Sequence, residues 1–207
     1  MRIAHVITRL ILGGAQQNTL LTAAGQAEDF GDDVVVITGP GIGAEGSLVD
    51  WADNRGLELK LIPEMGRAIH PWNDFTSYRK IAAAIEEFAP DIVHTHSSKA
   101  GILGRAAASR QRIPVVHTIH GAAFHVGQSM LARAIFRRAE RWAARRCQAL
   151  ISVCDAMTDQ YVHAGIAAPE KFTTIYSGMD IEPFLDPPRD REEVRSELGF
   201  TGDDVVI

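Results

Sequence analysis

Short apolar runs alternate with longer amphipathic stretches along most of the chain, and each kind of run predicts one kind of element. Short runs rich in β-branched residues indicate buried strands. These runs lie at Ile3–Ile7, Val34–Thr38, Leu57–Ile62, Ile92–His96, Val115–Ile119, Ala149–Val153 and Phe172–Tyr176. The stretches between them predict helices at Ala15–Ala27, Ser47–Asn54, Asp74–Phe88, Lys99–Arg110, Ser129–Arg146 and Asp155–His163.

The predicted strands carry apolar residues on both of their faces, and single helices separate them along the chain. Strands of this kind belong in a parallel sheet that helices cover on both sides. The fold class is therefore α/β, with a doubly wound, mostly parallel sheet of about seven strands. Ligands of such sheets bind beyond the carboxyl ends of the strands, so the residues after each strand are the first candidates for a site.

The pattern changes after Tyr176, where the chain becomes rich in proline and aspartate. Residues 1–180 are predicted to form one domain. Residues 181–207 are predicted to be a linker, a charged helix at Asp190–Leu198 and the first residues of a strand at Val205–Ile207. Such a strand needs a neighbour to pair with, so we expect the native polypeptide to continue into a second, C-terminal domain.

Length and charge narrow the class of protein. A chain of 207 residues with 46% hydrophobic residues can bury a core without disulfides. Cys147 and Cys154 are too few for a disulfide framework, and we expect reduced thiols in a cytoplasmic protein. No stretch of about 20 uninterrupted apolar residues is present, so the sequence predicts no membrane-spanning helix.

Gly13 and Gly14 follow the first predicted strand and open the first helix. Paired glycines let a ligand approach the backbone closely, and the free N–H groups of a first helical turn attract anions. A diphosphate would suit this position. A tight turn between strand and helix without a ligand explains the pair equally well.

The segment Gly41–Gly46 matches the spacing G-x-G-x-x-G that is typical of dinucleotide-binding turns. It follows a strand and precedes a helix, and Glu64 lies about 20 residues further on, as that motif requires. The match comes after the second strand, however, and Pro40 lies in the turn. A flexible glycine-rich loop is the favoured interpretation.

Four histidines lie at or near the ends of the fourth and fifth predicted strands, namely His94, His96, His117 and His120. Residues at positions i and i+2 share one face of a strand, so His94 and His96 could reach the same ion. The pattern offers no clear third ligand and no supporting carboxylate, so we predict no metal site. We expect His120 to face the ligand cleft, because Gly121 lets the chain turn away there.

Ser97, Ser98 and Lys99 lead from the fourth strand into a helix. Hydroxyl and N–H groups at a helix start suit phosphate or sugar hydroxyls, and a lysine adds positive charge. The alternative is that one serine caps the helix while the lysine is solvated.

The charge is unevenly distributed: although the net charge is −5, one predicted helix is strongly basic, with six arginines and one glutamate between residues 133 and 146. Four of the arginines recur every four residues and form a stripe: Arg133, Arg137, Arg141 and Arg145. A cationic stripe can lie on an anionic membrane surface, or it can be a solvated face. Nucleic acid is not expected, because the whole chain is acidic and aromatic residues do not interleave with the basic ones.

Five motifs in order resemble one known family. They are GGAQ (13–16), DIVHTHSSKAG (91–101), HTIHG (117–121), ALISVCDAM (149–157) and IYSGMD (175–180). Together they resemble the N-terminal domain of the group 1 family of retaining glycosyltransferases, which have the two-domain GT-B fold. The resemblance runs from Met1 to about Asp180, and it implies a Rossmann-like N-terminal half of that fold. Ser177 and Met179 depart from the Asn-Gly-Val-Asp turn that is usual in the family.

The resemblance implies the chemistry of the whole protein. A sugar would move, with retention, from a nucleotide-diphosphate donor to a glycan or lipid-linked acceptor, as in polysaccharide biosynthesis, with no obligatory metal or other cofactor. Gly13 and Gly14 would lie against the donor diphosphate, and His120 would contact the donor sugar or its leaving group. Ser97, Ser98, Lys99 and Gly121 would line the acceptor side of the cleft.

The same resemblance assigns the phosphate-binding basic residues to a C-terminal donor-binding domain. Stabilisation of a departing diphosphate needs such cations, so we expect the 207 residues alone to be inactive. We expect a cytoplasmic protein, with the inner membrane surface as a further expected location. Two alternatives stay open, a dinucleotide-dependent oxidoreductase or epimerase that uses Gly41–Gly46 and a noncatalytic sugar-binding module.

Overall fold

The computed structural model describes residues 1–125 and 127–206. Its centre is a seven-stranded sheet in the order β3-β2-β1-β4-β5-β6-β7, in which every neighbouring pair is parallel. The predicted doubly wound α/β class is therefore confirmed. The strands are β1 (Arg2–Ile7), β2 (Asp33–Thr38), β3 (Glu58–Leu61), β4 (Ile92–His96), β5 (Val115–Ile119), β6 (Ala149–Ser152) and β7 (Phe172–Thr174).

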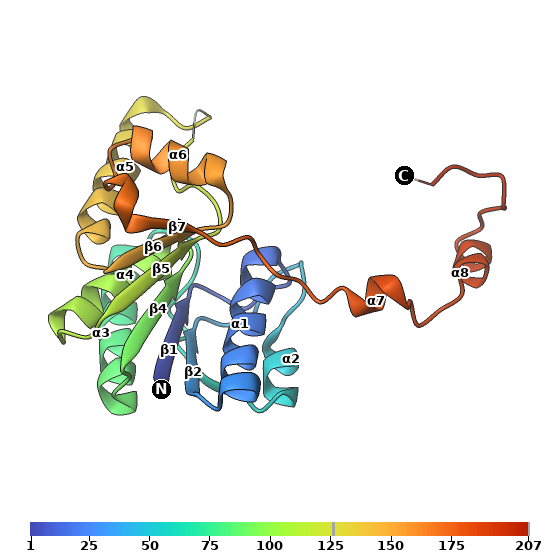
Figure 1. Ribbon diagram of the computed structural model, residues 1–207, viewed down its shortest axis with the longest axis horizontal. Helices are drawn as coiled ribbons and strands as arrows, with labels where there is room; N and C mark the ends of the chain where they lie inside the picture. Colours follow the sequence, from blue (N-terminus) through green and yellow to red (C-terminus); the bar gives the residue numbers. More distant parts are fainter. Residues whose placement is uncertain (126, 207) are drawn as a thin grey trace. The chain divides into compact units, whose positions relative to one another are not determined.

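Helices cover both faces of the sheet (Figure 1). On one face, Leu20 of α1 and Ala52 of α2 pack in a cluster with Ile3 and Ile7 of β1. On the other face, Ile81 of α3 packs in a second cluster with Ala4 and Val6 of the same strand. The helices of this domain are α1 (Gly14–Phe30), α2 (Val49–Asn54), α3 (Pro71–Phe88), α4 (Ser98–Arg110), α5 (Met130–Ala144) and α6 (Asp155–His163).

Helix α3 begins three residues before the predicted start at Asp74. Pro71 occupies its first turn, where the fixed φ of proline suits a helix and its missing N–H is not needed. His70 caps the helix, because its Nδ1 accepts a hydrogen bond from the backbone N–H of Asn73 at 3.3 Å. A histidine cap is outside the usual Ser, Thr, Asp and Asn set, which explains why the sequence pattern placed the start too late.

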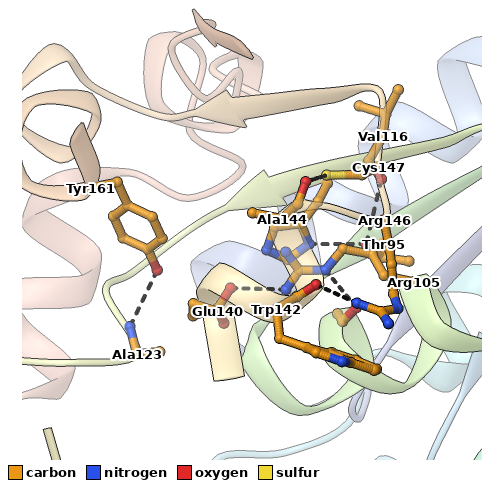
Figure 2. Close-up of polar contacts among 12 residues, drawn as sticks. Thr95, Arg105, Val116, Ala123, Glu140, Trp142, Ala144, Arg146, Cys147 and Tyr161 are labelled. Atoms are coloured by element: carbon orange, nitrogen blue, oxygen red, sulfur yellow. Dashed lines mark hydrogen bonds and ion pairs between the residues drawn. The ribbon is translucent and has the colours of Figure 1, made fainter. Parts of the chain in front are cut away.

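A buried ion pair joins α4 to α5 (Figure 2). Nη2 of Arg105 donates to Oε2 of Glu140 at 2.9 Å, and the two side chains are 0% and 1% exposed. Nε of Arg105 also donates to the carbonyl oxygen of Gly101 at 2.8 Å. The single glutamate of the basic helix is thus a core residue and not part of a solvated face.

The chain divides into two compact units, Met1–Ser177 and Gly178–Ile207. The second unit holds two short helices, α7 (Glu182–Leu185) and α8 (Arg191–Glu197). Oδ1 of Asp190 caps α8 by accepting from the backbone N–H groups of Glu192 and Glu193 at 2.9 and 3.2 Å. The strand predicted at 205–207 is not formed by residues 205 and 206, which have no paired neighbour strand, and residue 207 lies outside the described residues.

Candidate functional site

The site lies at the carboxyl edge of the sheet, where β1 and β4 are neighbours in space but are far apart in the sequence. The connections from these two strands lead to helices on opposite faces of the sheet, and such a divergence is where ligands of doubly wound sheets bind. Oγ1 of Thr8 lies 2.7 Å from Oγ of Ser97 and accepts from the N–H of Ala100 at 3.2 Å. These bonds tie the end of β1 to the start of α4.

Gly13 and Gly14 open α1 at this edge, as predicted. Gly13 has an extended backbone with φ of −178°, and no side chain caps the helix. A Cβ on Gly14 would meet no heavy atom within 4 Å, and one on Gly13 would meet only the side chain of Gln16. The surface at the helix start is therefore bare backbone, which a ligand can approach closely.

The Gly41–Gly46 loop packs against the loop that follows β1. The N–H of Leu12 donates to the carbonyl oxygen of Gly46 at 3.1 Å, and the N–H of Leu48 donates to that of Leu10 at 2.9 Å. A Cβ on Gly41 would lie 2.6 Å from the carbonyl oxygen of Leu10. Protein packing thus accounts for the glycine, and α2 begins only at Val49.

A chain of side-chain hydrogen bonds runs from α1 through the sheet to His120. Oε1 of Gln26 lies 2.7 Å from Nε2 of His5, and Nδ1 of His5 lies 3.0 Å from Nε2 of His96. Nδ1 of His96 lies 3.1 Å from Nε2 of His120. His5 and His96 are buried, whereas His120 is partly exposed at the end of β5.

Burial keeps these rings uncharged at neutral pH. Loss of water lowers the pKa of His5 to about 4, and it lowers the pKa of His120 to about 4 as well. The pKa of His96 lies well below its usual value, first because of burial and then because of the neighbouring histidines. Around neutral pH, His120 therefore acts as a neutral hydrogen-bonding group and not as a cation.

His94 and His117 lie beside this chain. Nε2 of His94 lies 2.7 Å from Oγ1 of Thr118, and Nδ1 of His117 lies 2.9 Å from Oγ1 of Thr95. His5, His94 and His96 each place one ring nitrogen within 4.8 Å of the others, which is a spacing that a metal ion could bridge. The hydrogen bonds already use both nitrogens of His5 and His96, so a metal would have to displace them.

Lys99 is paired within the protein. Its Nζ lies 2.6 Å from Oδ1 of Asp74 and also donates to the carbonyl oxygen of Ala68, and its side chain is 13% exposed. Ser97 has φ of 56° and makes no side-chain cap, whereas Ser98 is the first residue of α4. The alternative of a serine cap beside a solvated lysine is therefore wrong, because Lys99 ties α4 to α3 and Ser97 bonds Thr8.

The arginine stripe of α5 divides into two parts. Nη2 of Arg137 donates to the carbonyl oxygen of Ala164 at 2.7 Å, and Nε of Arg141 donates to that of Gly165 at 2.6 Å. These two side chains thus hold the end of α6, which is a structural role. Arg133 is half-buried, and Arg145 is exposed.

A second face of α5 is exposed and carries both large apolar side chains and arginines. Leu131, Ile135 and Trp142 are 72%, 57% and 42% exposed. Their spacing places them on one side of the helix, together with the exposed Arg138 and Arg145. We call these five residues the α5 outer face. None of the helices in the described part of the chain combines the length and the apolar character that crossing a bilayer requires.

Sequence reasoning missed His5, Gln26 and the α5 outer face. A histidine within an apolar strand was the available signal for His5, but Gln26 lies in an ordinary helical pattern. Leu131, Ile135 and Trp142 also have the spacing of one helix face, but the four-residue repeat of arginines was the stronger pattern in the same helix.

The seven-stranded, doubly wound parallel sheet is the fold of a GT-B-type glycosyltransferase domain. Residues 13–178 match the Glycosyl transferase 4-like domain, and the chain belongs to this family. The dinucleotide interpretation of Gly41–Gly46 is therefore not supported, in agreement with the packing of that loop.

Curated relatives are also glycosyltransferases. The chain is 30% identical over 185 residues to the Escherichia coli UDP-Gal:alpha-D-GlcNAc-diphosphoundecaprenol alpha-1,3-galactosyltransferase, covering 89% of this chain and 46% of the relative. It is 31% identical over 123 residues to D-inositol 3-phosphate glycosyltransferase from Saccharomonospora viridis, covering 56% of this chain and 28% of the relative. The chain thus spans less than half the length of these relatives.

Solved structures share the fold. HepE from Anabaena, in complex with UDP and glucose, has a TM-score of 0.72 at 19% identity over 96% of this chain and 50% of that one. UDP-GlcNAc 2-epimerase from Neisseria meningitidis, bound to UDP-GlcNAc, has a TM-score of 0.67 at 13% identity over 99% of this chain and 56% of that one. Both likenesses concern the fold.

Proposed function

We propose that the protein containing this chain transfers a sugar, with retention, from a nucleotide-diphosphate donor to a glycan or lipid-linked acceptor. This chain would be its acceptor-side half. The observation that carries the proposal is the family match over residues 13–178. Coverage of 46% of the Escherichia coli relative fits a half, and that relative's name includes UDP-Gal and a diphosphoundecaprenol-linked sugar.

In this proposal the donor diphosphate lies against Gly13 and Gly14. The bare backbone at the start of α1 supports this, because N–H groups there can donate to phosphate oxygens. His120 contacts the donor from the end of β5 as a neutral ring. The cations that stabilise the leaving group would come from a C-terminal domain, so this chain alone would be inactive.

The acceptor side is formed by Ser97, Ser98, Lys99 and Gly121. Lys99 is already paired with Asp74 and Ala68, so its role would be to hold the loop before α3 in place and not to bind an anion directly. Ser97 shares a hydrogen bond with Thr8 at the edge between β1 and β4. A sugar hydroxyl could join that bond, since each hydroxyl both donates and accepts.

We further propose that the α5 outer face docks on an anionic membrane surface. Its apolar side chains would enter the lipid interface while Arg138 and Arg145 contact anionic headgroups, which is how amphipathic interfacial helices bind. This assignment differs from the arginine stripe, because Arg137 and Arg141 hold α6. A lipid-linked acceptor would then be near the site.

Substitutions in the complete polypeptide test the donor assignment. Gly14→Val should raise the KM for the UDP-sugar, because a side chain would occupy the surface that the diphosphate needs. Gln17→Ala is the control, because Gln17 is exposed one turn along the same helix. Transfer of label from UDP-sugars that is insensitive to Gly14→Val would contradict this placement of the donor.

A further inference from the structure

The hydrogen-bonded chain Gln26–His5–His96–His120 joins a helix to the candidate cleft through three rings. Its ends lie on α1 and just after β5, and its middle lies on β1 and β4. His5 and His96 are 0% and 1% exposed, so water has little access to these links. Which nitrogen of each ring carries the proton is therefore decided by the hydrogen-bond partners of that ring.

A neutral imidazole carries one N–H donor and one nitrogen acceptor. His5 uses both of its nitrogens in the chain, and so does His96. If one ring donates through Nε2, it must accept through Nδ1, and the next ring must then donate through its own Nε2. All three hydrogen bonds between Gln26 and His120 consequently have the same donor-to-acceptor direction, either toward Gln26 or away from it.

Gln26 decides between the two directions. Its Oε1 faces Nε2 of His5, and a carbonyl oxygen can only accept. His5 must then donate to Gln26, His96 must donate to His5, and His120 must donate to His96. We propose that Gln26 is a positioning residue that fixes all three rings as Nε2–H tautomers and leaves Nδ1 of His120 as a hydrogen-bond acceptor.

This inference rests on the proposed function where it concerns the substrate. An acceptor at Nδ1 of His120 suits a hydroxyl group and disfavours a diphosphate, which has only oxygens that accept. Of the two contacts that the family resemblance implies, the donor sugar hydroxyl is therefore favoured over the leaving group. Rotation of the Gln26 amide by half a turn would present its NH₂ group, reverse every bond and favour the diphosphate instead.

The neighbouring groups leave this chain of bonds intact. His94 packs on His96 with ring centroids 4.1 Å apart, but its Nε2 bonds Oγ1 of Thr118. His117 bonds Thr95 on the other face of the strands. Burial also lowers the pKa of each ring in the chain, so the neutral forms that the tautomer argument needs are the populated ones.

Nuclear magnetic resonance of the chain labelled with ¹⁵N-histidine tests the proposal. Long-range ¹H–¹⁵N correlations at neutral pH distinguish a protonated ring nitrogen from an unprotonated one. We expect Nε2 to be protonated and Nδ1 to be unprotonated in His5, His96 and His120. A protonated Nδ1 on His120 in the unaltered chain would overturn the proposal, and so would signals that shift when a chelator removes a bound metal ion.

Two variants of Gln26 test whether this residue fixes the tautomer of His120. Gln26→Met keeps the length of the side chain but removes the acceptor, so His120 should show a mixture of both tautomers. Gln26→Glu keeps an acceptor and should restore the Nε2–H form of His120. Gln17→Met on the exposed side of α1 is the matched control and should change nothing.

Identical His120 signals in the unaltered chain and in Gln26→Met would overturn the role of Gln26. If Gln26→Met does not fold, the other two polypeptides still test the proposal, because a protonated Nδ1 on His120 in the unaltered chain or in Gln26→Glu would overturn it. None of these readings depends on sugar transfer. An inactive complete polypeptide would therefore refute the proposed function and leave the tautomer assignment standing.

Discussion

Nδ1 of His96 lies 3.1 Å from Nε2 of His120, so a ring inside the sheet holds the orientation of a ring at the edge of the candidate cleft. The two residues belong to neighbouring strand ends, because His96 ends β4 and His120 follows β5. The orientation of His120 therefore depends on His96, which is itself buried.

Replacement of His96 should impair turnover more than substrate binding. In the complete polypeptide, we expect His96→Leu to lower kcat by about 10- to 100-fold, because His120 would lose its orienting bond. The KM for the donor should change by less than about threefold, because phosphate contacts at α1 remain. Steady-state kinetics with a UDP-sugar measure both. His163→Ala, at an exposed position, is the control, and an equal loss there would contradict this role of His96.

Acid should destabilise the domain through its buried histidines. His5 and His120 have folded-state pKa values of about 4, below the usual 6.5, so the unfolded state binds more protons between these values. The free energy of unfolding should fall as the pH falls from about 6.5 to about 4, by up to ~1.4 kcal/mol per pH unit for each such histidine.

Urea titrations at several pH values measure how the free energy of unfolding depends on pH. His120→Gln should reduce this pH dependence by about one proton, because it removes one of the buried neutral rings. A stability that is flat from neutral pH down to pH 5 would contradict the burial of neutral histidines.

Breaking the Arg105–Glu140 ion pair should lower the free energy of unfolding strongly. Glu140→Gln leaves a buried guanidinium without its counter-charge, and we expect a loss of about 3–5 kcal/mol in the free energy of unfolding. The double variant Arg105→Met with Glu140→Leu should recover most of that loss, because it removes both buried charges. Urea unfolding measures both variants. A change of under about 1 kcal/mol, which is typical of exposed ion pairs in general, would contradict the buried pairing.

The α5 outer face should bind anionic vesicles. Ile135→Ser with Trp142→Ser should weaken binding by more than about 10-fold, because both apolar side chains would leave the lipid interface. Arg138→Glu with Arg145→Glu should weaken it further at low salt, by about 1 kcal/mol or more for each residue. Arg110→Glu, at an exposed residue of α4, is the control. Vesicle sedimentation that does not depend on lipid charge would contradict membrane docking.

The strand periodicity was sufficient to predict the sheet, because apolar residues on both faces of a short strand have few other places in a soluble domain. The positions of Gly13, Gly14 and His120 at the carboxyl edge of the sheet were predictable for a similar reason, since the residues that follow parallel strands meet at one edge. Lys99 and Arg137 could not be assigned this way. Their partners, Asp74 and the carbonyl of Ala164, are distant in the sequence, and only packing brings them together.

The most direct test compares two polypeptides in one assay, the 207-residue chain and the complete polypeptide that its gene encodes. Each is incubated with labelled UDP-sugars and with lipid-linked acceptors, and the anomeric configuration of the product is determined. The account predicts transfer with retention by the complete polypeptide and no transfer by the 207-residue chain. Transfer by the 207-residue chain alone, or acceptor binding without transfer by the complete polypeptide, would contradict it.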